Sequence, residues 1–491
     1  MKNSKKKLTE MARAVTLGLF GLFFASEEAY GAEQPSVAGT QRLLTLDSCR
    51  AMALRNNKQM GVAKVKQEVN ANLRKSARTQ YLPKVNPVGG YMWMSREISL
   101  LNDDQKEALS NLGTIATSKL QNAPEPVTSQ LPAATAGDMG QFAGALNQVG
   151  ASLVEGFRTD TRNMFAGAVT VTQPVFMGGA LVAANKIADI NEQMAANSLE
   201  MKRQNTLYNI DQMYWQVVSL RHKQTLAESY VELVKKLKGD GLSVGVRVNE
   251  AEMALTQVQD GLALSKMLLC QLIGLDEDEA ITLADEESAG LGTEIAAEPQ
   301  HAGQADAAFA NRPELKVLQN TVDLSRQTTN ALKAGNLPTV LLTGGYMVSN
   351  PNTFNGFEKK FGGVWNIGVV VRVPVWNWGD VKYKVRASKG ATTMANLELD
   401  DAREMISLQV RQSNFKVKEA QKKLTMAQSN VANADENLRM ANLAFKEGTA
   451  SFTTVMEAQT AWNAAQSQLI DAEIGVKLSE VELQKALGTL Q

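Results

Sequence analysis

Residues 82–92 of this 491-residue chain read LPKVNPVGGYM, and residues 337–347 read LPTVLLTGGYM. A second segment, PVFMGG at 174–179, recurs as PVWNWG at 374–379. Because both segments occur once in each half and in the same order, we predict that the chain is internally duplicated. Each half reads as a helix, a strand, a loop, a second strand and two long helices. The repeated motif at the end of the second strand is marked by Pro174, Gly179, Pro374 and Gly379.

The repeat predicts where the parts of the chain begin and end. The first repeat covers 32–275, an acidic linker covers 276–306, and the second repeat covers 307–491. After an initial helix, the first repeat should hold strands at 85–94 and 164–173 and a helical hairpin at 180–275. In the second repeat, the corresponding segments are strands at 339–348 and 364–373 and a hairpin at 380–489.

Residues 1–31 read as a secretory signal peptide. The basic cluster Lys5 to Lys7 precedes an apolar run from Ala14 to Ala25, and small residues at Ala29 and Gly31 suit a cleavage site. The apolar run is too short to span a bilayer as a helix, and no later run reaches the roughly 18 apolar residues that a spanning helix needs. A membrane contact would therefore have to be made by strands.

Composition excludes several classes of function. The chain balances 51 basic with 51 acidic residues, so no basic excess indicates nucleic acid. Cys49 and Cys270 lie in stretches with helical periodicity, which predicts buried thiols that serve packing. His222 and His301 have no metal-ligand spacing to another His or Cys. With no phosphate-binding loop, nucleophile elbow or zinc motif, we expect no enzyme, no cofactor and no metal.

Four stretches keep apolar or small residues at alternating spacings of three and four, as a coiled-coil seam does. One of them is Ala420, Leu424, Ala427, Val431, Ala434, Leu438 and Ala441. Gly448 predicts the turn between two antiparallel helices of a hairpin. At about 1.5 Å per residue, a helix from Asp380 to Phe445 would be about 100 Å long, enough to cross a compartment. An antiparallel coiled-coil scaffold fits the same periodicity.

The predicted strands alternate in polarity. Between 364 and 373, apolar Trp365, Ile367, Val369 and Val371 alternate with other residues, and each strand is about ten residues long, the length of a tilted membrane strand. Four strands cannot close a barrel, and an open edge in lipid leaves backbone groups unpaired. A membrane barrel would therefore be shared between chains, and a soluble four-stranded sheet is the alternative.

The signal peptide, the duplicated strand pairs ending in Pro-Val-aromatic, and the hairpins with a glycine turn together resemble the TolC-type outer-membrane efflux protein family. The resemblance implies a mainly α fold with transmembrane β: a homotrimer with a twelve-stranded β-barrel in outer-membrane lipid, continued by an α-barrel of coiled-coil helices through the periplasm. It also implies two partners, a periplasmic adaptor and an inner-membrane transporter of the RND or ABC type. No nucleic acid is expected.

The resemblance extends to the channel constriction near the second hairpin. Family members close the tunnel there with acidic rings and a hydrogen-bonded latch. The second acidic position matches Glu457, the first is Thr454 here, and Asp240 matches an acidic position of the first hairpin. Phe445 and Ala450 replace the tyrosine and the arginine of the latch, so a polar latch is not expected.

The two hairpins differ in length. Arg203 and Gly274 are 71 positions apart, whereas the corresponding Arg403 and Gly488 are 85 positions apart, so the first hairpin lacks 14 residues. Because 14 residues is two heptads, the seam is preserved, and we expect the loss at the tip near Val234.

These inferences predict an outer-membrane channel of a tripartite efflux or type I secretion system, a passive duct for small molecules or proteins. The alternative is a periplasmic coiled-coil adaptor or scaffold without a membrane barrel. Neither the exported substrate nor the partner pump can be read from the sequence.

Overall fold

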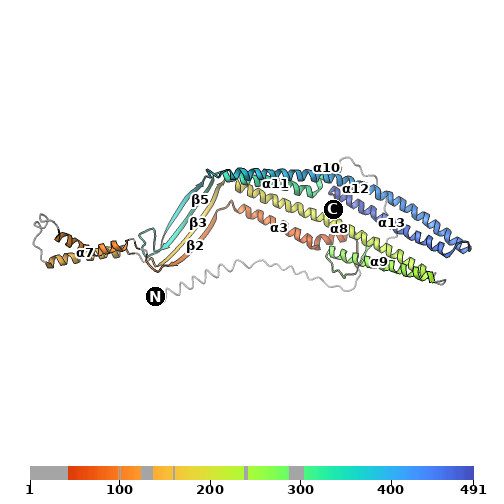
Figure 1. The fold of residues 1–491 in the computed structure, drawn as a ribbon, viewed down its shortest axis with the longest axis horizontal. Helices are drawn as coiled ribbons and strands as arrows, with labels where there is room; N and C mark the ends of the chain where they lie inside the picture. Colours follow the sequence, from red (N-terminus) through yellow and green to blue (C-terminus); the bar gives the residue numbers. More distant parts are fainter. Residues whose placement is uncertain are drawn as a thin grey trace.

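The computed structural model describes residues 42–97, 99, 101–122, 136–158, 161–236, 242–286 and 304–490. Three parts follow one another along an elongated molecule: a small helical hairpin, a sheet of strands and a wall of long helices (Figure 1). The predicted signal peptide 1–31 and most of the linker 276–306 lie outside the described residues.

The wall consists of long helices side by side. Helix α8 contacts α3, α9, α11 and α13, and α12 contacts α11 and α13. Across the wall, the order is therefore the pair α3 and α9, then α8, then the pair α11 and α13, and finally α12. These helices are α3 (Lys58–Thr79), α8 (Ala180–Lys236), α9 (Leu242–Ile273), α11 (Pro313–Lys333), α12 (Asp380–Lys446) and α13 (Phe452–Leu487).

The predicted coiled-coil seams are the buried faces of these helices. On α12, Val417, Leu424 and Ala427 are buried, and on α13 Val455 and Ala458 are buried. Helix α12 has 67 residues, so at about 1.5 Å per residue it is about 100 Å long. The expected long helix is therefore confirmed.

Shorter helices continue one another end to end beside the two long ones. Asn57, before α3, donates from Nδ2 to the carbonyl of Leu272 in α9 at 2.9 Å. Arg312, before α11, donates to the carbonyl of Ala486 in α13 at 3.2 Å. Gly488 ends α13 with a φ of 70° and closely approaches Arg312. The wall thus alternates one long helix with one pair of stacked helices.

The sheet has four antiparallel strands in the order β2-β3-β5-β6. Their bounds are β2 (Lys84–Trp93), β3 (Asn163–Met177), β5 (Thr339–Asn350) and β6 (Gly362–Arg372). The expected end of the second strand before Pro174 is wrong, because β3 continues to Met177. Strand β5 lies beside this extension and pairs Thr339 with Met177, and the register shifts between Pro174 and Phe176. A bulge next to a proline, which has no N–H to donate, accounts for the shift.

The connection between β2 and β3 forms a helical hairpin beyond the sheet, on the side away from the wall (Figure 1). It holds α4 (Asp103–Ser110), α5 (Leu112–Gln121) and α7 (Ala136–Gly156). Gly113 and Gly150 allow the close helix contact, since a Cβ at either position would overlap a backbone oxygen of Ala143 or Leu109.

A compact core lies midway along the wall, where α8 and α9 meet α2 (Leu46–Asn56) and a two-stranded sheet of β1 (Arg42–Leu44) and β4 (Ile281–Leu283). Cys49, Tyr214 and Cys270 are fully buried there. Both cysteines are free thiols, so the prediction of packing thiols is confirmed. Burial raises the pKa of the Cys49 thiol to about 12.

Candidate functional site

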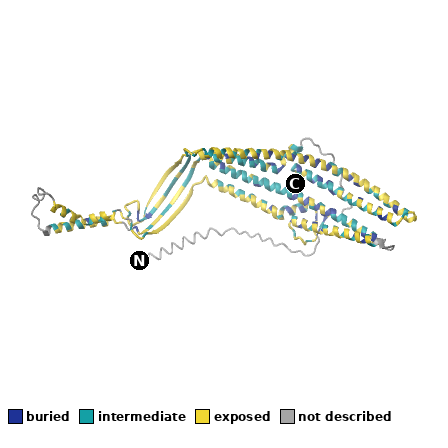
Figure 2. Cartoon of the chain, viewed as in Figure 1, coloured by how far each residue is buried: buried dark blue, intermediate teal, exposed yellow. Residues whose placement is uncertain are grey.

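The sheet is covered by no other part of the described chain (Figure 2). Every residue of β2 and all but the first residue of β6 are exposed. The strand pairing gathers apolar side chains on one face, as in the pairs Val85 with Val171, Val169 with Tyr346, Tyr346 with Trp365, and Leu342 with Val369. The apolar side chains of this face would be exposed to water unless another apolar phase covered them.

The opposite face of the sheet is more polar. Asn86 pairs with Thr170, Thr343 pairs with Gly368, and Thr339 pairs with Arg372. Because successive side chains of a strand alternate between faces, each strand contributes to both surfaces. The alternation predicted from the sequence therefore produces one apolar and one polar face.

Aromatic rings gather near both ends of the sheet. At the end near the small helical hairpin, the rings of Tyr91 and Phe165 lie 4.8 Å apart. At the end near the wall, Trp376 and Trp378 lie 5.6 Å apart and are 75% and 85% exposed. Two aromatic girdles flanking an apolar band are typical of membrane strands.

The repeated motif lies where the strands lead into the long helices. Gly179 and Gly379 have φ angles of 85° and 82° and immediately precede α8 and α12. Such angles favour glycine, and both carbonyls accept the first helical hydrogen bond, from Ala183 and Tyr383, at 3.0 Å. The prolines differ in environment, because Pro174 lies within β3 and Pro374 lies two residues after β6.

The tip of the second hairpin contains Gly448, which has a φ of 74°. Its N–H donates to Phe445 at 3.1 Å, and the N–H of Thr449 donates to Ala444 at 3.0 Å. This is the Schellman pattern that ends a helix at a glycine. The rings of Phe445 and Phe452 meet edge to face at 6.3 Å across the turn.

Thr454 and Glu457 are exposed and lie one helical turn apart on α13, so they share one face. The hydroxyl of Ser451, which caps α13, lies 3.0 Å from that of Thr454. Between Thr454 and Glu457 in the sequence, Met456 is buried against Val234 and Val248 of the first hairpin. Asp240 lies outside the described residues.

The helix bounds locate the difference between the hairpins. Helix α8 has 57 residues against 67 in α12, and α9 has 32 against 36 in α13. Helices α8 and α12 both begin right after their motif glycine, and α9 and α13 both end at a glycine, Gly274 or Gly488, with positive φ. The missing residues therefore fall at the tip of the first hairpin.

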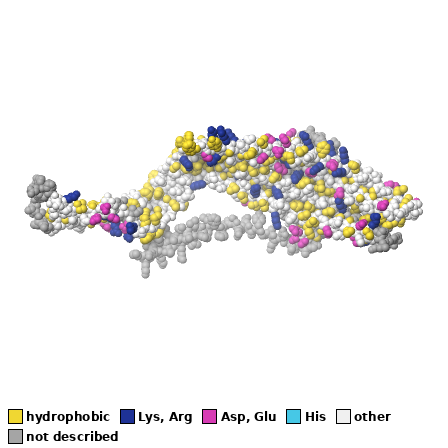
Figure 3. All heavy atoms as spheres, in the orientation of Figure 1, with side chains coloured by type: hydrophobic (Ala, Val, Ile, Leu, Met, Phe, Trp, Pro, Cys, Tyr) yellow, Lys and Arg dark blue, Asp and Glu magenta, His cyan; other side chains and the backbone are white. Residues whose placement is uncertain are grey.

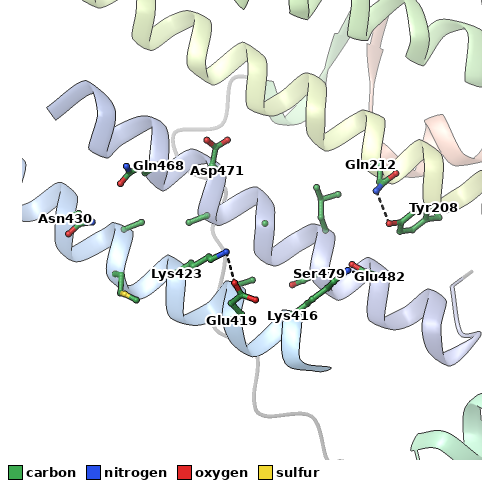
Figure 4. Close-up of a pocket in the computed structure, with 16 residues that line it drawn as sticks. Tyr208, Gln212, Lys416, Glu419, Lys423, Asn430, Gln468, Asp471, Ser479 and Glu482 are labelled. Carbon is green, nitrogen blue, oxygen red and sulfur yellow. Dashed lines mark hydrogen bonds and ion pairs between the residues drawn. The ribbon is translucent and has the colours of Figure 1, made fainter. Parts of the chain in front are cut away.

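A groove runs along α13 between α8 and α12 (Figure 4). It has a volume of about 680 Å³. Lys423 donates to Glu419 at 2.8 Å, and Gln212 donates to the Tyr208 hydroxyl at 2.9 Å. Gln468 lines the groove and follows Glu457 on α13 at helical spacing, so the groove and the tip residues share one face of this helix.

The groove lies on the side of the wall opposite α10 (Gln304–Asn311). On α12, Val417 is buried in the seam with α13. Lys416, on one side of Val417, lines the groove. Asn414, on the other side, donates from Nδ2 to Gln304 Oε1 of α10 at 2.8 Å. The wall therefore has one bare face with the groove and one face with an added layer.

Within the ranges that the structure describes, no group of three or more His, Cys, Asp or Glu side chains is arranged to hold a metal ion. In the same ranges, no helix is long and apolar enough to cross a membrane.

Known proteins resemble this chain in sequence and in structure. The family model of outer membrane efflux proteins matches residues 305–489. Outer membrane efflux protein BepC of Brucella suis is 26% identical over 356 residues, which cover 68% of this chain and 74% of BepC. Over residues 305–489 the chain is similar to the outer membrane efflux protein family. The resemblance drawn from the repeat and the hairpin turn is thereby confirmed.

Two further efflux proteins show how far the likeness reaches. Outer membrane protein TolC of Vibrio cholerae is 26% identical over 171 residues, which are 34% of this chain and 39% of TolC. The crystal structure of the Campylobacter jejuni CmeC outer membrane channel superimposes with a TM-score of 0.68 at 14% identity, covering 90% of this chain and 85% of CmeC. BepC is an outer membrane efflux protein and CmeC is an outer membrane channel, and the fold of CmeC is shared along nearly the whole chain.

Proposed function

We propose that this protein is the outer-membrane channel of a tripartite efflux or secretion system and serves as a passive export duct. The observation that carries the proposal is a sheet with one bare apolar face, joined through residues 373–379 to a 67-residue helix. The sheet would cross the outer membrane and the helices would extend through the periplasm. A periplasmic scaffold without a barrel is not favoured, because it would leave the apolar face in water.

The depth of the apolar band suits a bilayer. From Trp365 to Trp376 is 11 positions, or about 36 Å at about 3.3 Å per residue of extended chain. A tilt of about 40° reduces this to about 28 Å, close to the band of roughly 25 Å in outer-membrane barrels. The two aromatic girdles would then lie at the two interfaces.

Open edges support assembly into a homotrimer. Among the described residues, the edge strands β2 and β6 each pair on one side only. Unpaired backbone groups in lipid cost several kcal/mol each. Three chains would pair β6 of one with β2 of the next and close a twelve-stranded barrel. A head-to-tail contact of this kind closes into a ring.

The edges of the helical wall also lack partners within the part of the chain that the structure describes. On α12, exposed apolar residues follow at helical spacing: Met394, Leu397, Met405, Leu408, Phe415 and Met426. On the opposite edge, α3 exposes Val62, Val65, Val69 and Leu73, and α9 exposes Val246, Met253 and Leu264. We infer that α12 of one chain packs against α3 and α9 of the next, so that three walls form a helical tunnel. The internal duplication would give this tunnel six similar units.

The side of the wall without α10 would face the lumen, because an added layer fits only on the outside of a narrow tube. Glu457, Thr454 and the groove lie on this bare side. We infer that the three copies of Glu457 form an acidic ring at the periplasmic end, with Thr454 beside it. Like charges crowded together attract cations. Asp240 of the first hairpin is proposed as a further member of this constriction.

The same proposal implies partners beyond a homotrimer. An outer-membrane duct needs an adaptor at its periplasmic tip and an inner-membrane pump of the RND or ABC type that supplies energy. Because the first hairpin is shorter at its tip, it has less surface for contact with an adaptor. The second hairpin, with Gly448, is therefore the main docking element.

Cell fractionation with trimer analysis tests the function. The mature protein should remain with outer membranes in high salt, require detergent for extraction, and run as a trimer that heating converts to monomers. In a planar bilayer, the purified trimer should conduct ions. Release by salt as a detergent-free monomer would instead support the scaffold.

A further inference from the structure

A group of basic side chains lies where the wall meets the sheet. On α12, Lys382, Arg386 and Lys389 follow at spacings of four and three, and on α11 Arg326 and Lys333 follow at a spacing of seven, so each set occupies one face of its helix. Figure 3 shows Lys and Arg side chains gathered beside hydrophobic ones at this junction. Together these five residues are called the basic belt.

The basic belt borders two open hollows between α11 and α12. One hollow, of about 330 Å³, is lined by Lys333, Lys382, Arg386 and Lys389 among others. The other, of about 360 Å³, is lined by Arg326, Lys333 and Lys389. Because Lys333 and Lys389 line both, the hollows form one continuous basic surface.

The floor of this surface is polar and firmly held. The hydroxyls of Thr329 and Ser388 lie 2.7 Å apart, and those of Ser325 and Thr392 lie 2.8 Å apart, each pair joining α11 to α12. Thr329 and Thr392 also line the second hollow. Because Thr329 and Thr392 also donate to the backbone carbonyls of Ser325 and Ser388, these hydroxyls are satisfied within the protein. The ammonium and guanidinium groups above them are therefore the donors suited to phosphate oxygens.

Four cations of the basic belt have no carboxylate partner. In the described chain, Lys333, Lys382, Arg386 and Lys389 form no ion pair, whereas Arg326 pairs with Asp323 at 3.1 Å. The nearby Asp380 is paired with Lys384 at 2.8 Å. The surface therefore carries an uncompensated positive charge that favours an anion.

The position along the molecule indicates which anion. The belt begins just after Trp376 and Trp378, which mark the periplasmic girdle of the proposed barrel. At about 1.5 Å per residue, Lys382 to Lys389 lie about 3 to 14 Å beyond the start of α12. That depth is the headgroup region of the periplasmic leaflet and the water next to it.

The belt also faces away from the lumen. Lys389 is followed along α12 by Ser407 and Arg411 on the same face, and these residues line a pocket together with Gln304 and Asp306 of α10. Since α10 covers the outer side of the proposed tube, the basic belt is on the outer side too. It thus meets lipid headgroups rather than the exported cargo.

We propose that the basic belt is a binding site for the phosphate headgroup of an anionic phospholipid in the periplasmic leaflet, with Trp376 and Trp378 beside the acyl chains. The proposal rests on the proposed channel function, which places the sheet in the outer membrane. Such a lipid would fix the depth of the barrel in the membrane, since each bound headgroup ties α11 and α12 to the interface.

Native mass spectrometry of the detergent-purified protein tests the site. Phosphatidylglycerol should remain bound to the trimer, and phosphatidylcholine should not. A variant carrying Lys382→Gln, Arg386→Gln and Lys389→Gln should bind phosphatidylglycerol at least about tenfold more weakly. A control variant carrying Lys384→Gln, Lys422→Gln and Lys446→Gln removes the same charge from the same helix and should bind like the wild type.

Other results would overturn the lipid site or the channel assembly. Equal binding of phosphatidylglycerol by both variants, or equal binding of the two lipids by the wild type, would overturn the lipid site. Displacement of phosphatidylglycerol by equimolar inorganic phosphate would also overturn it and assign the surface to free phosphate. The same spectra show the oligomer: monomers alone would refute the channel assembly, whereas trimers without lipid preference would refute only this site.

Discussion

Replacing Val369 with arginine is expected to weaken the assembled sheet, whereas the same change at Val370 is expected to be mild. The two valines are neighbours on β6 and are 61% and 50% exposed in the single chain. Val369 pairs with Leu342 on the apolar face, and Val370 pairs with Leu341 on the face that also carries Arg372. The pair therefore compares the lipid side with the lumen side at nearly the same depth.

The magnitude follows from the position of Val369 along the strand. The girdle residues Trp365 and Trp376 place the middle of the apolar band between Val370 and Val371. Val369 is about 1.5 residues away, about 5 Å along the strand and about 4 Å in depth at a tilt of about 40°. Arginine on the lipid face costs about 2–4 kcal/mol at the midplane and about 0–1 near the interfaces, which gives about 2 kcal/mol here. Three chains raise this to about 6 kcal/mol per trimer.

The assay is the fraction of heat-resistant trimer in detergent as a function of urea concentration. Val369→Arg should lower the urea midpoint clearly or abolish the trimer, and Val370→Arg should change it by less than about 1 kcal/mol. Equal losses at both positions would refute the assignment of the two faces.

Three further outcomes are expected. Glu457→Gln should reduce the preference for cations in planar-bilayer recordings, because it neutralises the acidic ring. The control Asp306→Asn on α10 should leave ion selectivity unchanged. Equal ion selectivity in both variants would show that Glu457 is only a solvated carboxylate. Gly448→Ala should lower the thermal stability of the trimer by about 1 kcal/mol, since alanine is strained at positive φ, whereas Gly475→Ala, inside α13, should not; no difference between them would contradict the tip geometry. Burial raises the pKa of Cys49 to about 12 from 9.0, so its contribution to stability is complete below about pH 9 and is lost as the pH rises towards 12. Over that pH range, the melting temperature of Cys49→Ala should therefore fall less than that of the wild type. The same pH dependence of the melting temperature in both proteins would exclude this thiol as its cause.

Local patterns in the sequence were sufficient for most of the fold. The spacing of Val417, Leu424 and Ala427 shows a helical seam, and the alternation of Ile367 and Val369 shows a strand with one apolar face. Both patterns depend only on neighbours along the chain. The turn at Gly448 was equally readable, because a glycine between two seams is a local signal.

Features that depend on distant partners could not be read in this way. Strand β3 continues past Pro174 because β5 pairs with it, and a proline alone predicts an end. Helix α7 holds several glycines that disfavour a helix, yet Gly150 is needed for close contact with α4. Asn57 and Arg312 join stacked helices through carbonyls that lie more than a hundred residues away. The basic belt likewise combines two helices separated by two strands.

A three-dimensional reconstruction of the detergent-purified protein by electron cryomicroscopy would test the shared barrel most directly. We expect three-fold symmetry, with β6 of each chain hydrogen-bonded to β2 of the next and Glu457 facing the lumen at the periplasmic tip. A particle in which β2 and β6 remain unpaired, or in which each chain stands alone, would contradict this expectation.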